Sequence, residues 1–451
     1  MTTAPASLIA DLTDRELDRF AASHPRSGEL REAAEGALLS GVPMNWMTRW
    51  PGAWPVVFDT AAGARLTDVD GNAYVDFCLG DTGAMAGHSP APTVAAAAAR
   101  MERGITTMLP SEDAGPLGEE MTRRFGLRHW QFSLTATDAN RFAIRLCREI
   151  TGRSKILVFD HCYHGSVDET FAELDADGHV VAQLGNVGPP VPLEETTRVV
   201  QFNDVEALES ELGKGDVACV LAEPALTNVG IVLAEDGFHA KMRELTRAAG
   251  TLLIIDETHT LCCGPGGYTR AEGLEPDLMT IGKAIAGGVP VGAYGMTDEV
   301  AEGVLAKTVW EAADVGGVGG TLAGNALSLA AARATLAEVL TEAAFERMIG
   351  LGERFAAGCD EVIAEFELPW QATRLGCRVE YMFLPTPPKN GGEAAAAFDT
   401  PLDALLHLYM LNRGILMTPF HMMALMSPAT TEADVDAHTA ALREFAAELT
   451  A

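Results

Sequence analysis

Two carboxylates and a lysine stand where this sequence could most readily support catalysis. Asp256 and Glu257 directly follow the apolar run Leu252–Ile255, and Lys283 comes two residues after the apolar run Leu278–Ile281. Short continuous apolar runs are typical of strands that are buried on both faces of a parallel sheet. The carboxyl ends of such strands are where α/β sheets place their ligands.

An amine and a carboxylate at such an edge indicate one particular chemistry. The amine of Lys283 can form a Schiff base with a carbonyl group, and the carboxylate of Asp256 can keep a pyridine nitrogen protonated. These are the two protein groups that a pyridoxal 5′-phosphate (PLP) site requires, with the cofactor ring as electron sink. The other interpretation is a carboxylate in a turn and a lysine in solvent, and these residues alone do not decide between the two.

A third feature could bind the phosphate of such a cofactor. Thr135, Ala136, Thr137 and Asp138 precede a stretch, 139–150, whose apolar residues recur at helical spacing. Free amide groups and the helix dipole attract phosphate to a helix N-terminus. The same pattern also fits an ordinary helix that is capped by Thr137 or Asp138.

The elements that must position these residues alternate between strand and helix from residue 155 onward. We expect strands over Lys155–Phe159 and Val217–Ala222 and a helix over Phe238–Ala249. This alternation predicts an α/β fold with a mostly parallel sheet and helices on both faces. After about residue 331 long helices dominate, with a few strands such as Arg378–Leu384, and a flexible loop is expected over Pro385–Glu393.

The N-terminal part has a different character. Residues 8–37 read as an acidic amphipathic helical region that is broken near Pro25, and Asp70-Gly71 marks a β-hairpin within Arg65–Cys78. We therefore divide the chain into three parts, which are an N-terminal segment that contributes to a small domain and a dimer interface (1–75), a large cofactor-binding domain (76–330) and a C-terminal small domain (331–451).

Composition excludes several classes of partner. The chain has 451 residues and a formal net charge of −31, which argues against nucleic acid or an anionic membrane surface as a partner. Its 8 cysteines show no CxxC spacing, so we expect buried thiols and no metal site. Neither a signal peptide nor a membrane span is evident, and we expect a cytoplasmic protein.

Several different short motifs follow one another along the chain, namely Asp70-Gly71, Gly87-His88, the Thr135–Asn140 turn, Tyr163-His164-Gly165, Glu223-Pro224 with Asn228, Asp256-Glu257, Lys283, and Gly320-Thr321 with Gly324-Asn325. In this ordered set the sequence resembles class III aminotransferases, which are PLP enzymes of fold type I. It looks most like the branch of glutamate-1-semialdehyde aminomutase and β-amino-acid aminotransferases. The resemblance extends from about residue 50 to the C-terminus.

The resemblance implies a role for each matched residue. Lys283 would form the Schiff base with PLP and move the proton between substrate and cofactor, and Asp256 would pair with the pyridine nitrogen. Tyr163 would stack on one face of the ring, with Thr258 on the other.

The remaining matches concern the phosphate and the ring hydroxyl. Ala136 and Thr137, in the turn that begins at Thr135, would give backbone amides to the phosphate. Thr321 would reach that phosphate from the neighbouring subunit, so the resemblance implies a homodimer with shared active sites. Two residues, Glu223 and Asn228, would lie on the hydroxyl side of the ring.

The resemblance also implies a fold, which has a large domain with a mostly parallel sheet flanked by helices, and a smaller α+β domain.

The cofactor site departs from the family pattern at three positions. Ala136 replaces a glycine, Asp138 replaces a glutamate, and Thr258 replaces a valine and puts a hydroxyl against the ring.

The substrate side departs as well. The β-amino-acid enzymes hold a substrate carboxylate with two arginines, whose positions are Trp46 and Phe420 here, and Arg49 could substitute for one of them. Loss of this clamp allows an amino alcohol, an amine or an aminophosphonate as substrate.

Other polar residues have weaker claims. We interpret His164 as structural and His421, in a methionine-rich segment, as core or pocket wall. His259 could face the surroundings of the cofactor, and Asp81 and Thr82 could border the substrate pocket.

We therefore predict a PLP-dependent aminotransferase that moves an amino group between a primary amine or amino acid and an oxo acid. The alternative is a PLP-dependent aminomutase or a lyase that eliminates ammonia or phosphate, because fold does not fix reaction. The altered phosphate turn, Thr258 and the lost arginines increase the weight of that alternative. A regulator or scaffold that merely binds PLP is disfavoured by the presence of Lys283, Asp256 and Tyr163.

Overall fold

The computed structural model describes residues 4–307, 317–419 and 421–451. These residues form two compact units. The small unit comprises Met1–Pro90, Glu346–Pro387 and Ala397–Ala451, and the large unit comprises Ala91–Phe345 and Pro388–Ala396. The predicted limits at residues 75 and 330 thus differ from the limits of these units, which fall at 90 and 345.

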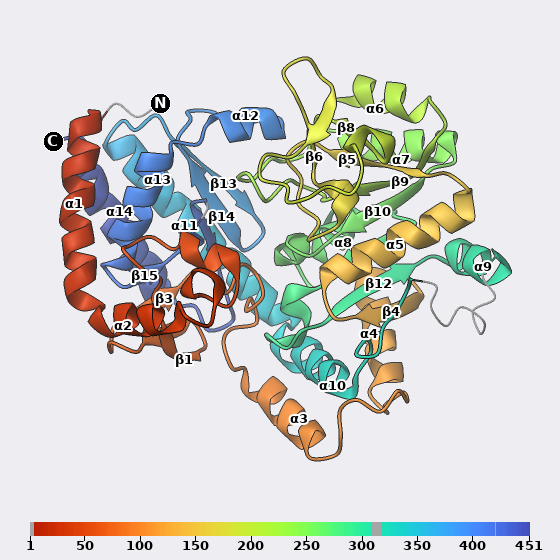
Figure 1. Ribbon diagram of the computed structural model, residues 1–451, viewed down its shortest axis with the longest axis horizontal. Helices are drawn as coiled ribbons and strands as arrows, with labels where there is room; N and C mark the ends of the chain where they lie inside the picture. The colour runs from red at the N-terminus through yellow and green to blue at the C-terminus, as the bar shows by residue number, and fades with distance from the viewer. Residues whose placement is uncertain (1–3, 308–316, 420) are drawn as a thin grey trace. The chain divides into compact units, whose positions relative to one another are not determined.

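The large unit is built on one sheet (Figure 1) with the strand order β4-β12-β11-β10-β9-β5-β8. Neighbouring strands from β11 to β8 run parallel, and β12 is antiparallel to both of its neighbours. The prediction of a mostly parallel sheet is confirmed. Its strands are β4 (His129–Ser133), β5 (Lys155–Phe159), β8 (Thr197–Val200), β9 (Val217–Ala222), β10 (Leu252–Asp256), β11 (Leu278–Ile281) and β12 (Gly292–Met296).

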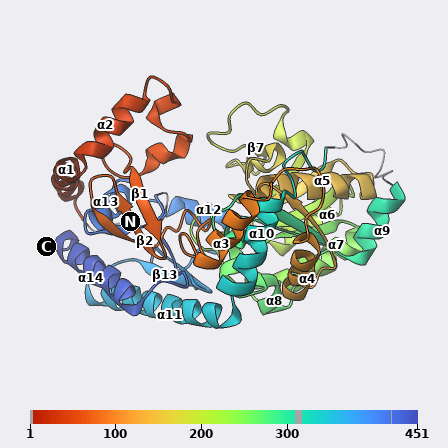
Figure 2. The ribbon, with the colours of Figure 1, turned by 90° about the horizontal axis from the view of Figure 1, so that it is seen from below.

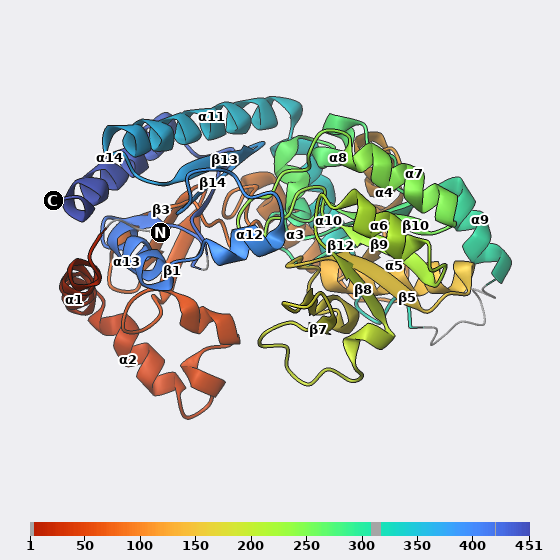
Figure 3. The same cartoon turned by 90° about the horizontal axis from the view of Figure 1, so that it is seen from above.

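Helices cover both faces of this sheet. α5 (Ala136–Thr151) lies on one face, and α7 (Phe238–Ala249) and α8 (Gly267–Glu272) lie on the other (Figures 2 and 3). Every residue of β9 and of β11 is buried, as expected for strands between two helical layers. The other α-helices described in this unit are α3 (Ala91–Met101), α4 (Ala114–Phe125), α6 (Val205–Leu212), α9 (Asp298–Lys307), α10 (Ala326–Ala334) and α12 (Gly391–Ala396).

The register of β10 and β11 fixes where the candidate residues lie. Ile254 pairs with Leu278 and Asp256 pairs with Thr280, so partners are 24 residues apart in sequence. The amide of Glu257 donates to the carbonyl of Thr280 at 2.8 Å, which extends the pairing one residue past the strand. The turns that follow the two strands therefore begin side by side.

The small unit is α+β and contains both chain ends. β3 (Ala73–Asp76) pairs antiparallel with β2 (Arg65–Asp68) and parallel with β15 (Ile415–Leu416). This confirms the hairpin predicted at Asp70-Gly71. The other strands of the unit are β1 (Phe58–Ala62), β13 (Gln371–Leu375), β14 (Arg378–Met382) and β16 (Met423–Leu425).

Helices complete the small unit. α1 (Ala6–Ser23) and α2 (Pro25–Ala34) meet at the predicted break, and α13 (Thr400–Leu411) and α14 (Glu432–Leu449) come from the C-terminal part. α11 (Glu342–Glu365) lies along the β13–β14 hairpin in both side views (Figures 2 and 3). This close packing uses Gly352, where a Cβ would lie 3.0 Å from the carbonyl oxygen of Gly376.

Two predicted loops are placed in part. Residues 314–316 of the predicted glycine-rich stretch 314–326 lie outside the described residues. From residue 317 the stretch forms turns that lead into α10. The segment predicted as a flexible loop, 385–393, contains the start of α12 at Gly391. No helix in the described part of the chain is long and apolar enough to cross a membrane.

Gly292, in β12, tests how tightly the sheet packs against the turn before α5. A Cβ at this position would lie 2.2 Å from the carbonyl oxygen of Thr135. Because that obstacle is backbone, we expect Gly292→Ala to lower the free energy of unfolding by about 1–3 kcal/mol. Urea unfolding followed by circular dichroism measures this change.

Gly350→Ala is the matched control. Gly350 is exposed in α11, and a Cβ there meets nothing within 4 Å. Alanine in a helix is favoured over glycine by about 0.5–1 kcal/mol, so this variant should be more stable than the wild type. Equal stabilities for Gly292→Ala and the wild type would contradict the tight packing at β12.

Candidate cofactor and catalytic site

Asp256 ends β10 as a buried carboxylate that is held from three directions. Its Oδ2 accepts a hydrogen bond from Nδ2 of Asn140 at 2.8 Å and lies 2.9 Å from Nδ1 of His164. Its Oδ1 accepts from the backbone amide of Thr258 at 3.0 Å. The carboxylate therefore has one fixed orientation at the edge of the sheet.

These contacts decide the charge of the site. Burial on its own would raise the pKa of Asp256, but the hydrogen bonds from His164, Thr258 and Asn140 lower it to about 2. Burial likewise disfavours a charged imidazole, yet Cys162 and Asp256 raise the pKa of His164 well above its ordinary value. Asp256 is thus ionised at neutral pH and has a histidine cation beside it, while the structural role of His164 stays a prediction.

Asn140 ties the carboxylate to its surroundings. Its Oδ1 accepts from Oγ1 of Thr280 in β11 at 2.6 Å, and its Nδ2 also donates to the carbonyl of His164 at 3.1 Å. All of these side chains are buried. One residue of α5 therefore connects two strands and the turn that contains Tyr163.

Glu257, the second carboxylate, has a structural environment. It accepts hydrogen bonds from Oγ1 of Thr260 at 2.6 Å and from the amides of Tyr268 and Thr269. Burial raises its pKa. This side chain anchors the turn after β10 to the start of α8.

Lys283 directly follows Gly282, at the end of β11, and begins a short 3₁₀ turn, η6 (Lys283–Ala286). Its φ of 49° lies in the left-handed region, which is rare for a residue with a side chain and concentrated at functional sites. Its Nζ lies 2.8 Å from Nε2 of His259. His259, which from the sequence could face the surroundings of the cofactor, thus contacts the candidate reactive amine.

The N-terminus of α5 differs from the capping predicted for it. Oγ1 of Thr135 accepts from the amide of Asp138 at 3.1 Å, so Thr135 is the cap, and the prediction of Thr137 or Asp138 in that role is wrong. Ala136 and Thr137 are consequently the first helical residues, whose amides have no carbonyl one turn earlier to bond. This is the arrangement that receives a phosphate.

The turn that carries Tyr163 packs against this phosphate turn. The amide of Ser166 donates to Oγ1 of Thr137 at 3.1 Å, and a Cβ on Gly165 would lie 2.1 Å from the same oxygen. Tyr163 is half-buried and meets Phe171 edge-on, with ring centroids 6.4 Å apart. Glycine at 165 is therefore required for the close approach of the two turns.

Thr258 provides a direct test of whether the site fits PLP. Its hydroxyl is buried and has no hydrogen-bond partner among the described residues. Such a group is costly unless something binds it. With an ionised carboxylate, a lysine and open helix amides in the same unit, the polar groups of the site match the pyridine nitrogen, aldehyde and phosphate of PLP.

The remaining sequence-predicted residues are placed as follows. Glu223 is buried after β9 and accepts a hydrogen bond from Oγ1 of Thr227, whereas Asn228 is exposed. Thr321 is exposed in the turn before α10. Their roles toward the cofactor stay predictions, as does a homodimer.

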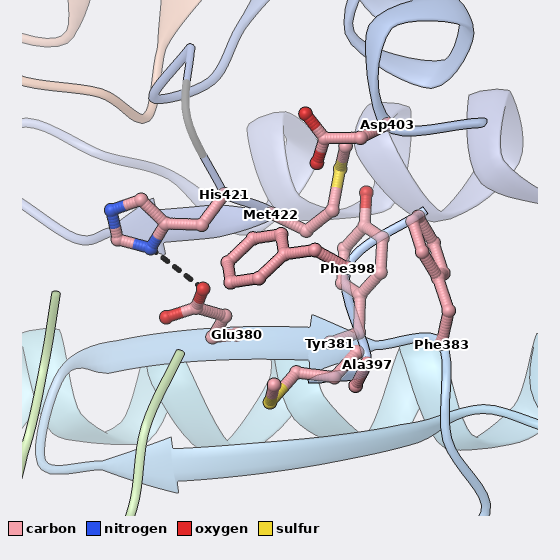
Figure 4. A pocket seen from close by; sticks show the side chains of 9 residues that line it. Glu380, Tyr381, Phe383, Ala397, Phe398, Asp403, His421 and Met422 are labelled. Carbon is pink, nitrogen blue, oxygen red and sulfur yellow. Dashed lines mark hydrogen bonds and ion pairs between the residues drawn. The ribbon is translucent and has the colours of Figure 1, made fainter. Parts of the chain in front are cut away.

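In the small unit, His421 lies in a pocket wall, as the sequence predicted. Its Nδ1 lies 2.6 Å from Oε1 of Glu380, and both side chains are buried (Figure 4). Asp403, on α13, lines the same pocket, whose volume of about 20 Å³ has room for little more than a water molecule. Burial raises the pKa of Asp403 to about 7, with the charges of His421 and Arg49 opposing the shift.

The structure describes one of the two positions at which the arginines of the β-amino-acid enzymes are missing. Trp46 is half-buried and Arg49 is exposed, and both belong to a 3₁₀ turn, η2 (Asn45–Arg49). Phe420 lies outside the described residues. Asp81 and Thr82, predicted at the pocket border, both have left-handed backbone conformations, with φ of 50° and 77°.

Cysteines and possible metal ligands give no further site. Seven of the eight cysteines are buried and Cys263 is half-buried, and all are free thiols, as expected. In the described ranges, one group of side chains has metal-ligand spacing, namely Asp175, Asp177 and His179, all exposed. Hydrogen bonds from the amides of Asp177 and His179 to Asp175 account for this group as a turn.

A family model for class III aminotransferases matches residues 47–441. The chain belongs to the class III aminotransferases. Glutamate-1-semialdehyde 2,1-aminomutase 2 of Halalkalibacterium halodurans is 34% identical over 403 residues, which are 86% of this chain and 90% of that protein.

Solved structures of class III aminotransferase relatives agree with the fold. A glutamate-1-semialdehyde-aminomutase from Pseudomonas aeruginosa PAO1 shares 50% identity over 99% of both chains with a TM-score of 0.97. A variant of that protein was solved in complex with PMP. An omega-transaminase from Sphaerobacter thermophilus shares 29% identity over 94% of this chain and 98% of its own, with a TM-score of 0.85. The chain has PLP fold type I, and PLP is its cofactor.

Neither a role for Asn140 nor a contact between His259 and Lys283 was predicted from the sequence. A signal for Asn140 was available, because it lies one helical turn after Ala136 and so faces the same side of α5. The signal for His259 is the strand register, which only pairing of β10 with β11 reveals.

The raised pKa of Asp403 predicts a pH dependence of stability. The folded state keeps a proton between about pH 4 and pH 7 that the unfolded state releases. This contribution to stability is therefore full below about pH 4 and is lost as the pH rises to about 7. Asp403→Asn has no proton to lose, so its free energy of unfolding should gain about 2 kcal/mol on the wild type between pH 5.5 and pH 7.5.

Urea unfolding at several pH values measures the difference between the two proteins. Asp18→Asn removes an exposed carboxylate of α1 and controls for the change in net charge. A difference between Asp403→Asn and wild type that stays constant across this pH range would contradict the burial of an acid at position 403.

Proposed function

We propose that this chain is a PLP-dependent aminomutase. In this reaction the amino group leaves one carbon of the substrate and returns to a neighbouring carbon of the same molecule. Substrate and product are isomers, and no oxo acid is consumed. The proposed substrate class is a small amino aldehyde or amino ketone.

The similarity to the Pseudomonas aeruginosa glutamate-1-semialdehyde-aminomutase carries this proposal. It extends over 99% of both chains at 50% identity, against 29% identity for the omega-transaminase. The relative from Halalkalibacterium halodurans is also named as a glutamate-1-semialdehyde aminomutase. An acid group is not part of the proposed substrate class, because Trp46 and Phe420 occupy the positions of the arginines that hold a substrate carboxylate in the β-amino-acid enzymes.

Asp256 and Lys283 would have separate roles in such a reaction. When bound, PLP supplies an electron sink that acidifies the C–H bonds next to the substrate nitrogen. Asp256, ionised and fixed by Asn140 and His164, would hold a proton on the pyridine nitrogen. Lys283 would take a proton from one substrate carbon and return it to another.

Binding falls to other groups of the same unit. The amides of Ala136 and Thr137 would bind the phosphate at the start of α5. Tyr163 and Thr258 would confine the ring between them, and the Thr258 hydroxyl would gain a polar neighbour. Confinement of the ring would hold cofactor and substrate in one orientation relative to Lys283.

The second candidate is the aminotransferase reaction, in which an amino group passes to a separate oxo acid. The omega-transaminase structure favours it, with a TM-score of 0.85 over 94% of this chain. The two reactions differ in one respect that can be measured, because only the aminotransferase stops when no acceptor is present.

The test is turnover without an acceptor. PLP-loaded protein is mixed with glutamate-1-semialdehyde and, separately, with amino alcohols, amines and aminophosphonates, all without an oxo acid. We expect continuous formation of a product with the mass of its substrate. Product formation that ends after one equivalent and resumes on addition of an oxo acid would establish the aminotransferase instead. Continuous release of ammonia or phosphate would establish a lyase.

Lys283 tests the cofactor chemistry by itself. We expect Lys283→Ala to bind PLP noncovalently, to lose the absorbance of the covalently bound cofactor and to lose turnover by at least about a thousandfold, because both covalent attachment and proton transfer depend on this amine. Lys307→Ala, which removes a lysine at the end of α9, is the matched control. Substantial turnover by Lys283→Ala would exclude the proposed role.

A further inference from the structure

The contact between His259 and Lys283 follows from the register of the sheet. Partners on β10 and β11 are 24 residues apart, as in the pair Asp256 and Thr280. His259 and Lys283 have the same separation and each lies three residues beyond that pair. The two turns thus continue the alignment of their strands and bring an imidazole beside the amine.

Each partner is held in place by its own turn. His259 precedes the 3₁₀ turn η5 (Thr260–Cys263), which Glu257 anchors through Oγ1 of Thr260. Lys283 begins η6 with a left-handed backbone conformation, which directs its side chain differently from that of an extended residue. The contact is therefore a product of two constrained turns.

The distance between the two groups is that of a hydrogen bond. Nζ of Lys283 and Nε2 of His259 are 2.8 Å apart, which is a normal hydrogen-bond length. Two cations at this distance would repel each other strongly, so one of the two nitrogens must act as acceptor. Either the ammonium donates to a neutral imidazole, or an imidazole N–H donates to a neutral amine.

The carboxylates nearest in sequence have other partners. Asp256 accepts from Asn140 and is paired with His164, and Glu257 accepts from Thr260 and two amides. Both carboxylates thus already accept hydrogen bonds from other donors. His259 is the base whose contact with Nζ the structure shows.

We propose that His259 is a catalytic residue that exchanges a proton with Lys283. In the forward step an N–H bond of the lysine ammonium breaks and an N–H bond forms at Nε2 of His259. The positive charge moves to the imidazole, the electron pair of the broken bond stays on Nζ, and nothing is oxidised or reduced. The amine is then neutral, which is the form that attacks a carbonyl carbon.

This role rests on the proposed function only in its use of PLP and Lys283, which the aminomutase and aminotransferase reactions share. It gives the chain a base that can prepare the lysine for attachment to the cofactor. The same base can receive the proton that Lys283 has taken from a substrate carbon.

The test measures attachment of PLP to Lys283 without any substrate. Apoprotein is mixed with PLP, the reaction is stopped with borohydride after increasing times, and mass spectrometry of the peptides gives the fraction of modified Lys283. We expect His259→Ala to slow this attachment at least about tenfold. Added imidazole should restore part of the rate to His259→Ala.

His259→Gln separates proton exchange from positioning. Its side-chain amide can accept a hydrogen bond from Nζ but cannot take up the proton. We expect this variant to be as slow as His259→Ala. Attachment at the wild-type rate in His259→Gln, or in His259→Ala, would overturn the proposal.

Two comparisons guard against other causes. His129→Gln changes an exposed histidine of β4 that lies 2.8 Å from Asp298, and it should attach PLP at the wild-type rate. Equilibrium binding of PLP and thermal unfolding show whether each variant is folded. Because the assay contains no amine substrate, an aminotransferase or lyase outcome in the turnover experiment leaves its result unaffected.

Discussion

The site depends on one buried negative charge. A carboxylate removed from water must be surrounded by donors, and Asp256 receives them from a helix, a turn and the backbone amide of Thr258. Asn140 can serve this carboxylate only if α5 lies at the right height over β10 and β11. Satisfying the charge therefore fixes the start of α5, where the phosphate would bind.

Adjacent residues of one type have opposite properties here. Asp256 and Glu257 are both fully surrounded by protein, yet the pKa of Asp256 is lowered and that of Glu257 is raised. The difference lies in their donors, because Asp256 has a positively charged imidazole beside it and Glu257 has only hydroxyl and amide groups. The position of each carboxylate at the end of the strand thus determines its donors, which include a cationic imidazole for Asp256 and backbone amides for Glu257.

Much of the fold of the large unit was predicted from the sequence. β5, β9, β11 and α7 have the predicted limits, because continuous apolar runs and helical periodicity are local signals. The helix cap at Thr135 was mispredicted, since several adjacent residues can cap a helix and tertiary contacts choose among them. The His259–Lys283 contact could not be predicted without the pairing of β10 with β11, which no local pattern encodes.

The small unit has a consequence for synthesis on the ribosome. β3 ends at Asp76 but takes its parallel partner from β15, which begins at Ile415, about 340 residues later. At roughly 5–20 residues per second, translation supplies that partner only after about 20–70 seconds. Until then the apolar side chains of α1 and β3 have no complete core, while the entire sheet of the large unit has already emerged. The nascent chain therefore presents an unpaired strand edge for most of its synthesis, which is the interval in which chaperones would bind it.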